Sequence, residues 1–305
     1  MKASHFVNKS ISIVIPCYNV ENTISNTIKA IKTSIRKCHT DWDWEIIAVN
    51  DGSNDSTRSI LSKINNITLI NHERNKSLSS ARNTGIYQSV GNYIAFIDAD
   101  IEVSDGWFCD MLLELTMSPN IVGLTGTLSP KNLNNISPLN QYLFSDYRGH
   151  RKSSKSTYLN YKSFVFSNTI VEKAVLDKTG FFDEGLKHYG GEDTELAIRI
   201  HKLYPFGMKK SSSFSFHITN KSLSDYLLSI YEYGRFNFPL IIHKHPNYKN
   251  DLGYFLCNPF FNNLFFNFVV EKAVSTLFRV MQHPLIIKFF VISSFIKGAR
   301  RGLKH

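Results

Sequence analysis

Two aspartates one residue apart, Asp98 and Asp100, directly follow the apolar segment Tyr93–Ile97. An uninterrupted run of apolar, β-prone residues is typical of a strand buried on both faces of a parallel sheet. Carboxylates at the carboxyl end of such a strand lie where open α/β sheets bind ligands. Oxygen ligands at this spacing suit Mg²⁺ or Mn²⁺, and either ion suits a bound diphosphate. Because Asp-x-Asp also occurs in ordinary surface turns, the metal site depends on the residues that accompany the pair.

Polar turns also follow two earlier apolar segments, 11–15 and 45–49. In a parallel sheet the carboxyl ends of the strands share one edge, so all three turns are predicted to line one crevice. Asp51 could then accept hydrogen bonds from a base or a ribose, and Tyr18 could pack against the base. Taken alone, the turn after Asn50 would indicate only a helix cap. The chain has neither a Gly-x-Gly-x-x-Gly nor a P-loop sequence, which argues against nicotinamide enzymes and P-loop enzymes.

A third acidic group, Glu192 and Asp193, follows Gly190 and Gly191 at the expected start of a helix. The two glycines have no side chains, so we expect a substrate to approach Asp193 closely. A carboxylate there could take a proton from an attacking hydroxyl, an effect typically worth ~10²–10⁴ in rate. The alternative is an ordinary acid at a helix start, which the helix dipole favours at any helix.

The elements that must position these residues alternate between strand and helix up to about residue 100. Such alternation predicts right-handed βαβ units and a mostly parallel sheet, an α/β fold. The expected strands are 11–15, 45–49, 67–70 and 93–97, with helices at about 21–35, up to 64, and 79–90. Beyond residue 105 the order is mixed. A helix near 107–117, a strand at 121–127 and a polar loop region at 129–160 are followed by the segment 164–168, a short helix to about 177, a helix to about 203 and a last strand at 214–217.

The C-terminal part is basic and apolar. Of the formal net charge of +10, residues 221–305 carry 11 Lys and Arg against 4 Asp and Glu, or +7. Helices are expected from residue 222, broken near Pro239, Pro246, Pro259 and Pro284. The longest apolar stretches, 260–270 and 285–296, are shorter than the ~20 residues that span a bilayer. We expect contact with an anionic membrane surface rather than with nucleic acid; a helical subdomain packed on itself or a homodimer is the alternative.

The termini and cysteines bear on location. Four widely spaced cysteines, at positions 17, 38, 109 and 257, indicate reduced thiols and neither a disulfide framework nor a zinc site. The first residues lack the apolar core of a signal peptide. These observations predict a cytoplasmic protein on the inner face of the cell membrane.

Several segments together resemble the inverting, family 2 type of glycosyltransferase with the GT-A fold. The matching segments follow the order and spacing of that family from about residue 10 to 220: 12–19, 49–57, 81–85, 91–100 and 190–196. Asn50 departs from the second acid that many relatives carry. The resemblance implies a GT-A domain at 1–220, a Rossmann-like sheet flanked by helices, and an α-helical extension at 221–305.

The resemblance also implies a role for individual residues. Pro16, Tyr18, Glu21 and Asp51 match positions that hold the base and ribose of the nucleotide, and Arg82 matches a position near the nucleotide or its phosphates. Asp98 matches the acid near the ribose and metal, Asp100 a direct ligand of the cation, and His217 a position that completes the metal shell. Asp193 matches the catalytic base, with Gly191 and Glu192 facing the acceptor.

These residues predict a metal-dependent enzyme that moves a sugar from a nucleotide donor, expected to be a UDP-sugar, to a hydroxyl of a glycan or lipid-linked glycan in cell-surface polysaccharide synthesis. A divalent cation, Mn²⁺ or Mg²⁺, would stabilise the charge on the leaving diphosphate. One alternative is a nucleotidyltransferase, which would normally need a Gly- and Lys/Arg-rich loop where Pro16 and Tyr18 lie. The other is an inactive sugar-nucleotide-binding scaffold of a membrane synthase complex.

Overall fold

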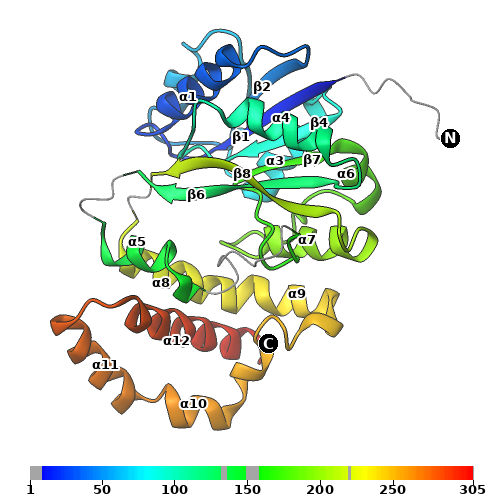
Figure 1. Cartoon of the computed structure of the whole chain (residues 1–305). Coiled ribbons are helices and arrows are strands. Elements are labelled where there is room, and N and C mark those ends of the chain that lie inside the picture. The colour runs from blue at the N-terminus through cyan, green and yellow to red at the C-terminus, as the bar shows by residue number, and fades with distance from the viewer. Residues whose placement is uncertain (1–8, 132–135, 149–157, 219–220, 305) are drawn as a thin grey trace. The chain divides into compact units, whose positions relative to one another are not determined.

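The computed structural model describes residues 9–131, 136–148, 158–218 and 221–304 (Figure 1). The chain divides into two compact units. The first, here called the sheet unit, comprises Met1–Lys131, Ser154–Glu184 and Asp193–Ile218. The second, here called the helical unit, comprises Asn132–Ser153, Gly185–Glu192 and Thr219–His305. Two short segments that precede the predicted boundary at residue 220 therefore group with the C-terminal helices.

The sheet unit is built on one eight-stranded sheet in the order β3-β2-β1-β4-β7-β6-β8-β5. Its strands are β1 (Ser10–Cys17), β2 (Asp43–Asn50), β3 (Thr68–Asn71), β4 (Tyr93–Ile97), β5 (Ile101–Val103), β6 (Gly123–Pro130), β7 (Asn168–Glu172) and β8 (Met208–His217). Its helices are α1 (Ile24–Lys37), α2 (Thr57–Leu61), α3 (Leu78–Gln88), α4 (Trp107–Met117), α6 (Lys173–Thr179) and α7 (Glu192–Leu203), the last of which begins one residue before the unit boundary.

The first four strands are parallel, as the alternation of strands and helices predicted. Ile13 of β1 pairs in register with Ile46 of β2 and with Ala95 of β4. Antiparallel pairing enters through β7, which lies between β4 and β6, and through β5, which pairs with β8. The prediction of an α/β fold is confirmed, with four parallel and three antiparallel strand pairs in the sheet.

Two strands of the sheet were not predicted. Strand β7 starts at Asn168, where a short helix to about residue 177 was expected, and that helix, α6, starts only at Lys173. The aromatic residues before β7, Phe164 and Phe166, are buried and pack edge-to-face against each other. Strand β5 was not predicted, since it has three residues and gains its pairing from β8, which lies more than a hundred residues later in the chain.

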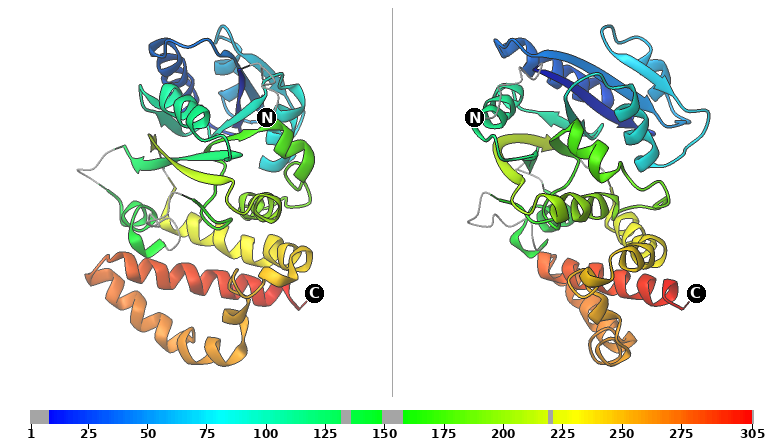
Figure 2. Two further views of the ribbon diagram at one scale, coloured as in Figure 1. Left: turned by 45° about the vertical axis from the view of Figure 1, so that its right-hand side comes forward. Right: turned by 90° about the vertical axis from the view of Figure 1, so that its right-hand side faces the viewer.

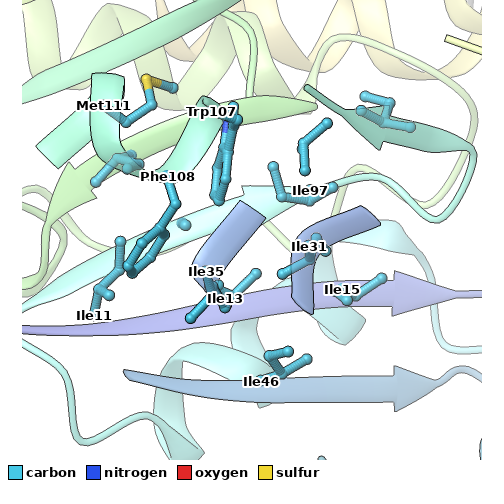
Figure 3. Close-up of a cluster of buried hydrophobic side chains, with 14 of the residues drawn as sticks. Ile11, Ile13, Ile15, Ile31, Ile35, Ile46, Ile97, Trp107, Phe108 and Met111 are labelled. Atoms are coloured by element: carbon cyan, nitrogen blue, oxygen red, sulfur yellow. The ribbon is translucent and has the colours of Figure 1, made fainter. Parts of the chain in front are cut away.

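The main core lies between the sheet and helices α1 and α4. Alternate residues of β1, among them Ile11, Ile13 and Ile15, face Ile31 and Ile35 of α1 (Figure 3). Trp107, Phe108 and Met111 of α4 close the cluster (Figure 3). Burial of each such side chain contributes about 1.5–3 kcal/mol. This core holds the central strands, and with them the turns at their carboxyl ends.

The cysteines depart from the prediction. Cys38, just after α1, and Cys109 of α4 form a disulfide, with their Cα atoms 5.3 Å apart. Cys17 and Cys257 are free. The expectation of four reduced thiols was therefore wrong for one pair. The two cysteines lie 71 residues apart in the chain, and they meet because α1 and α4 pack on the same core. Reduced thiols consequently no longer support a cytosolic location.

The helical unit contains mainly short helices, with breaks near Pro246, Pro259 and Pro284 as predicted. The helices are α5 (Pro138–Leu143), the 3₁₀ helix η1 (Asp146–Arg148), α8 (Leu223–Glu232), the π-helix η2 (Tyr233–Asn237), α9 (Phe238–Lys244), the 3₁₀ helices η3 (Pro246–Tyr248) and η4 (Tyr254–Cys257), α10 (Pro259–Phe265), α11 (Phe268–Val280) and α12 (Pro284–Gly302). The predicted break near Pro239 was wrong, because α8, η2 and α9 follow one another without interruption from Leu223 to Lys244. Helices α8 and α12 run side by side (Figure 2). In the described part of the chain, every helix is too short or too polar to cross a membrane.

Candidate active site

The carboxyl ends of β1, β2 and β4 lie along one edge of the sheet, as predicted. The turns after β1 and β2 are tied directly together: the backbone N–H of Asp51 donates to the carbonyl of Cys17 at 2.8 Å. The N–H of Asn19 donates to Ser53 Oγ at 3.0 Å. The third turn carries Asp98 and Asp100 at the end of the adjacent strand. The sheet therefore brings the three polar turns to one edge.

The Asp51 carboxylate is almost fully buried and is bound within the protein. Its Oδ1 lies 2.6 Å from Nδ1 of His72 and accepts the backbone N–H of Lys76 at 2.9 Å. Its Oδ2 accepts the N–H of Ser77 at 3.1 Å. Ser77 has a φ of +124°, which L-residues rarely adopt, and its Oγ caps α3 by accepting the N–H of Ser80. Asp51 therefore holds the loop that starts α3; its predicted contact with the base or ribose stays a prediction.

The other residues predicted to bind the nucleotide lie around the same turns. Pro16 is in β1, opposite Val49, and Tyr18 is exposed just after that strand. Glu21 is bonded to the turn after β2, because its Oε2 accepts the N–H of Ser56 at 2.9 Å. Tyr18 is 44% exposed. The roles of these residues in nucleotide binding stay predictions.

Arg82 of α3 links two carboxylates that the sequence places far apart. Its side chain is 1% exposed. Nη1 donates to Asp193 Oδ1 at 2.8 Å, and Nη2 donates to Asp98 Oδ1 at 3.0 Å. The guanidinium also lies over the ring of Phe182, 5.0 Å from its centroid. Arginine suits this position because its planar, always charged fork can bind two acids at once. The predicted leaving-group acid and the predicted base are thus joined by one buried cation.

Asp193 is held at both of its oxygens. Besides the contact with Arg82, its Oδ2 accepts the backbone N–H of Phe166 at 3.2 Å. The residue lies in the first turn of α7. Burial raises the pKa of the neighbouring Asp98 carboxyl to about 6. Arg82 opposes this rise, whereas the charges of Asp100 and Asp193 add to it. The carboxyl groups of Asp98, Asp100 and Asp193 therefore lie close enough to affect one another, and Arg82 binds two of them.

Asp100 and His217 meet through the pairing of β5 with β8. The backbone N–H of Ile218 donates to the Asp100 carbonyl, and Ile101 pairs in register with His217. Asp100 Oδ2 lies 3.2 Å from His217 Nε2. Two ligands at about 2.1 Å in adjacent positions of an octahedral ion are about 3.0 Å apart, so these donor atoms fit one Mg²⁺ or Mn²⁺. Among the described residues, no cluster of three or more Asp, Glu, His or Cys side chains could hold a metal.

Gly190 and Gly191 both have a positive φ, 81° and 94°. At Gly191 the structure differs from the expectation that a missing side chain leaves room for a substrate. A Cβ on Gly191 would lie 2.7 Å from Tyr233 Cε2 and 2.5 Å from Ile241 Cδ1. The space is therefore filled by the helical unit itself. Glu192 is buried next to them, and burial, with the charge of Glu192, raises the pKa of the Tyr233 hydroxyl.

Several residues that shape the site were not identified in the sequence. His72 and Phe166 bind the two predicted acids Asp51 and Asp193, and Tyr233 and Asn237 contact the Gly190 segment. A lone histidine, a backbone N–H and residues of a distant helix give no local signal. The polar-apolar patterns that place Asp51 and Asp193 at element ends could be recognised in advance.

Comparison with known proteins gives the family. Residues 12–180 match the family described as glycosyl transferase family 2. The chain is 28% identical over 225 residues to chondroitin synthase of Escherichia coli, covering 63% of this chain and 32% of that protein. It is 26% identical over 217 residues to poly-beta-1,6-N-acetyl-D-glucosamine synthase of Staphylococcus epidermidis, covering 68% of this chain and 50% of that protein. The chain thus spans a third to a half of the length of these relatives.

A solved structure agrees in fold. The crystal structure of S. aureus TarS 1–349 in complex with UDP-GlcNAc matches with a TM-score of 0.57 and 14% sequence identity, covering 95% of this chain and 89% of that one. This likeness confirms the predicted GT-A fold. The family match covers more than half of the chain and includes Asp51, Arg82 and the Asp98 turn. The chain belongs to glycosyl transferase family 2, whose members are inverting glycosyltransferases.

Proposed function

We propose that the protein transfers a sugar from a UDP-sugar to a hydroxyl of a glycan or lipid-linked glycan, with a divalent cation, in the synthesis of a cell-surface polysaccharide. The observation that carries this proposal is the pair of hydrogen bonds from Arg82 to Asp98 and Asp193. In this proposal Asp98 lies beside the leaving group and Asp193 takes the proton, and the buried Arg82 guanidinium binds both carboxylates. The UDP-GlcNAc in the TarS complex and the names of the two polysaccharide synthases support the donor and acceptor classes.

In the proposed reaction the acceptor hydroxyl attacks the anomeric carbon of the donor. The bond from that carbon to the diphosphate oxygen breaks, and its electron pair leaves with UDP. Asp193 Oδ2 or Oδ1 takes the hydroxyl proton as the new bond forms, because a sugar hydroxyl is a weak nucleophile near neutral pH. Attack opposite to the leaving group inverts the configuration. Arg82 keeps Asp193 oriented through its 2.8 Å hydrogen bond.

Asp100 and His217 would hold the cation through Oδ2 and Nε2, and Asp98 would lie beside it. A bound Mg²⁺ or Mn²⁺ supplies stabilisation of the negative charge on the departing diphosphate. This assignment rests on the 3.2 Å separation of the two donor atoms and on their chemistry, one oxygen and one imidazole nitrogen.

The experiment that tests the function measures UDP release. Purified protein is incubated with Mn²⁺ and a panel of UDP-sugars, alone and with p-nitrophenyl β-N-acetylglucosaminide as an acceptor probe. We expect slow release of UDP with water and faster release with an accepted glycoside. Pyrophosphate release from UTP and a sugar 1-phosphate would instead identify a nucleotidyltransferase. Binding of UDP-sugars without any turnover would identify a scaffold.

A second part of the proposal concerns α10, α11 and the start of α12. None of the thirteen residues of α11 is buried, all of which the structure describes. Phe268 and Val269 are 77% and 74% exposed. Further exposed apolar side chains lie on the neighbouring helices, namely Phe260, Leu264, Phe265, Leu277, Val280, Met281 and Leu285. We propose that these exposed apolar side chains form an interaction surface.

Charge favours an anionic lipid surface over a second copy of the chain as the partner. Residues 254–305 contain seven Lys and Arg but one acid, Glu271. Glu271 is already paired with Lys297 at 2.6 Å. Two such basic surfaces would repel each other in a homodimer, whereas anionic headgroups attract them. We therefore propose peripheral attachment to an anionic membrane surface. The expected location on the inner face of the cell membrane stays a prediction.

Vesicle co-sedimentation tests this attachment. We expect binding to vesicles of phosphatidylcholine mixed with phosphatidylglycerol, weaker binding to phosphatidylcholine alone, and loss of binding when Phe268→Ser and Val269→Ser are combined. Phe206→Ser is the matched control, because Phe206 is 73% exposed but lies in the sheet unit. Unchanged sedimentation of the double variant would refute the proposal. A molecular mass in solution of twice that of one chain, which falls to that of one chain in the double variant, would favour the homodimer.

A further inference from the structure

The two hydrogen bonds from Arg82 to its acids do not by themselves fix the guanidinium plane. Nη1 donates to Asp193 and Nη2 donates to Asp98, so these bonds hold two nitrogens of one planar group. A plane held at two nitrogens can still tilt about the line that joins them. A surface against the face of the guanidinium prevents this tilt, and with it the loss of direction toward either carboxylate.

The ring of Phe182 provides such a surface. Its centroid lies 5.0 Å from Arg82 Cζ. Phe182 and Arg82 are 3% and 1% exposed. The negative face of an aromatic ring attracts a cation, and this attraction is stronger where water is excluded. The Phe182 ring therefore both attracts the guanidinium and limits its orientation.

The same ring contacts the segments that carry the two acids. It packs edge-to-face against Phe96 and Phe166, with centroids 5.4 and 5.0 Å apart. Phe96 is in β4, two residues before Asp98. The backbone N–H of Phe166 donates to Asp193. The position of the Phe182 ring is thus defined relative to both acids that Arg82 must reach.

The backbone of Phe182 has no regular secondary structure to hold it. Residues 180–183 lie outside helices and strands. The N–H and C=O of a buried residue need partners, because water does not reach them. A fixed place for the ring therefore requires hydrogen bonds from another element to this backbone.

Asn83, the residue after Arg82 in α3, makes both of these bonds. Its Nδ2 donates to the carbonyl of Phe182 at 2.9 Å, and its Oδ1 accepts the N–H of Phe182 at 3.0 Å. Nδ2 also donates to Glu184 Oε1 at 2.9 Å. The orientation of the amide follows from these partners, since rotating it would direct Oδ1 at a carbonyl oxygen. Asn83 therefore holds the backbone of the residue whose ring lies against its neighbour in the chain.

The helix that carries Arg82 and Asn83 is fixed on the sheet. A Cβ on Gly85 would overlap Cγ1 of Val14, so α3 packs directly on β1. At the start of the helix, Ser77 accepts the N–H of Ser80 and donates its own N–H to Asp51. Helix α3 is therefore a rigid support from which the Asn83 amide sets the position of a neighbouring segment.

We propose that Asn83 is a positioning residue for Arg82: it holds the Phe182 ring against the guanidinium and so fixes the guanidinium plane between the two carboxylates. The proposal rests on the proposed glycosyl transfer, in which Arg82 keeps Asp193 oriented. All of these residues belong to the sheet unit. The alternative is that Asn83 only satisfies the buried backbone of Phe182, which would affect folding and not the reaction.

Asn83→Ala tests this inference in the full-length protein. UDP release is measured with UDP-N-acetylglucosamine, Mn²⁺ and p-nitrophenyl β-N-acetylglucosaminide, or with whichever UDP-sugar and glycoside the wild type uses. We expect kcat per UDP-binding site to fall about tenfold, equivalent to about 1.4 kcal/mol, because a displaced Arg82 no longer orients the base. The affinity for UDP with Mn²⁺ should stay at the wild-type value. Gln88→Ala, which removes an exposed amide from the same helix, is the matched control and should change neither quantity.

The same substitution in an Arg82→Lys background separates positioning from folding. Lysine has no planar group for the ring to align, so Asn83→Ala should leave the kcat of the Arg82→Lys protein nearly unchanged. An equal fall in both backgrounds would overturn the inference, because it would show that Asn83 does not act through Arg82. Wild-type kcat in Asn83→Ala would overturn it as well.

Phe182→Leu provides a second variant should Asn83→Ala fail to fold. It keeps an apolar side chain but removes the aromatic face beside Arg82, and it should lower kcat in the same way. Wild-type kcat in Phe182→Leu would show that the ring does not position the guanidinium.

Urea unfolding gives a readout that does not need turnover. The hydrogen bonds of Asn83 go to Phe182 and Glu184 and not to Asp193. If Asn83 acts through Arg82, Asp193→Asn should lower the urea midpoint less in the Asn83→Ala protein than in the wild type. Equal shifts would overturn the inference. Absence of turnover in the wild type would refute the proposed function instead, and the unfolding comparison would still decide whether Asn83 positions Arg82.

Discussion

Replacement of Asp193 by asparagine probes the proposed base with the smallest change in shape. Asp193 Oδ1 accepts from Arg82 and Oδ2 accepts from the Phe166 N–H, at 2.8 and 3.2 Å. Asparagine keeps one oxygen and replaces the other by an NH₂ group, which must then face one of these two donors. The amide also cannot take a proton. The variant therefore loses the base and one hydrogen bond while its volume stays the same.

The magnitudes of the two effects differ. Loss of a positioned base lowers the rate by ~10²–10⁴, which corresponds to about 3–5 kcal/mol in the activation free energy. The misplaced NH₂ leaves one donor without an acceptor, which lowers the free energy of unfolding by about 1–3 kcal/mol. Donor binding should be nearly intact, because Asp98 and Asp100 are unchanged.

UDP release at saturating UDP-sugar and Mn²⁺ measures the first effect, and urea unfolding measures the second. Asp110→Asn is the control, because Asp110 is also an acid in the first turn of a helix of the sheet unit but is exposed. It should leave kcat unchanged. Wild-type kcat in Asp193→Asn would refute the assignment of the base. Loss of activity only in proportion to loss of folded protein would show that Asp193 has a structural role alone.

Three further predictions concern other residues of the candidate site, namely Asp100, Arg82 and Ser77. Asp100→Ala should abolish the Mn²⁺-dependent part of UDP binding, and titrations that agree with and without metal would contradict the metal assignment. Arg82→Lys should lower stability by up to about 3 kcal/mol, since a single ammonium cannot bridge both acids; unfolding in urea and kcat/KM measure the effect, and wild-type values would refute the bridging role. Ser77→Gly should raise stability by about 1 kcal/mol, because relief of the positive φ exceeds the loss of a helix cap, which glycine replaces at a cost of a few tenths; a lower urea midpoint would contradict this balance.

Local pattern in the sequence was enough to predict the elements that carry the site. Buried parallel strands read as apolar runs, and Tyr93–Ile97 begins and ends as predicted. The helix Trp107–Met117 and the breaks at Pro259 and Pro284 were predicted for the same reason: burial, helical periodicity and missing N–H groups act within a few residues. The order of strands and helices then indicated which turns share an edge.

The contacts that make these turns a site depend on residues far apart in the chain. Arg82 meets Asp193 across 111 positions, and Cys38 meets Cys109 across 71. No local pattern encodes such pairs, because they result from how helices pack on the sheet. The same holds for Asp51, whose position was predicted but whose carboxylate faces His72 within the protein.

The sequence by itself determined the family, the α/β fold and the acids at the element ends, because each of these is expressed in short segments. Only the tertiary structure decided that the Arg82 guanidinium joins Asp98 and Asp193, and that η2 and α9 pack beside Gly191. Asn237 has no recognisable motif, and its hydrogen bonds to the carbonyls of His188 and Gly190 appear only in the tertiary structure. Packing between distant segments, which local propensity does not describe, therefore converts predicted turns into an organised site.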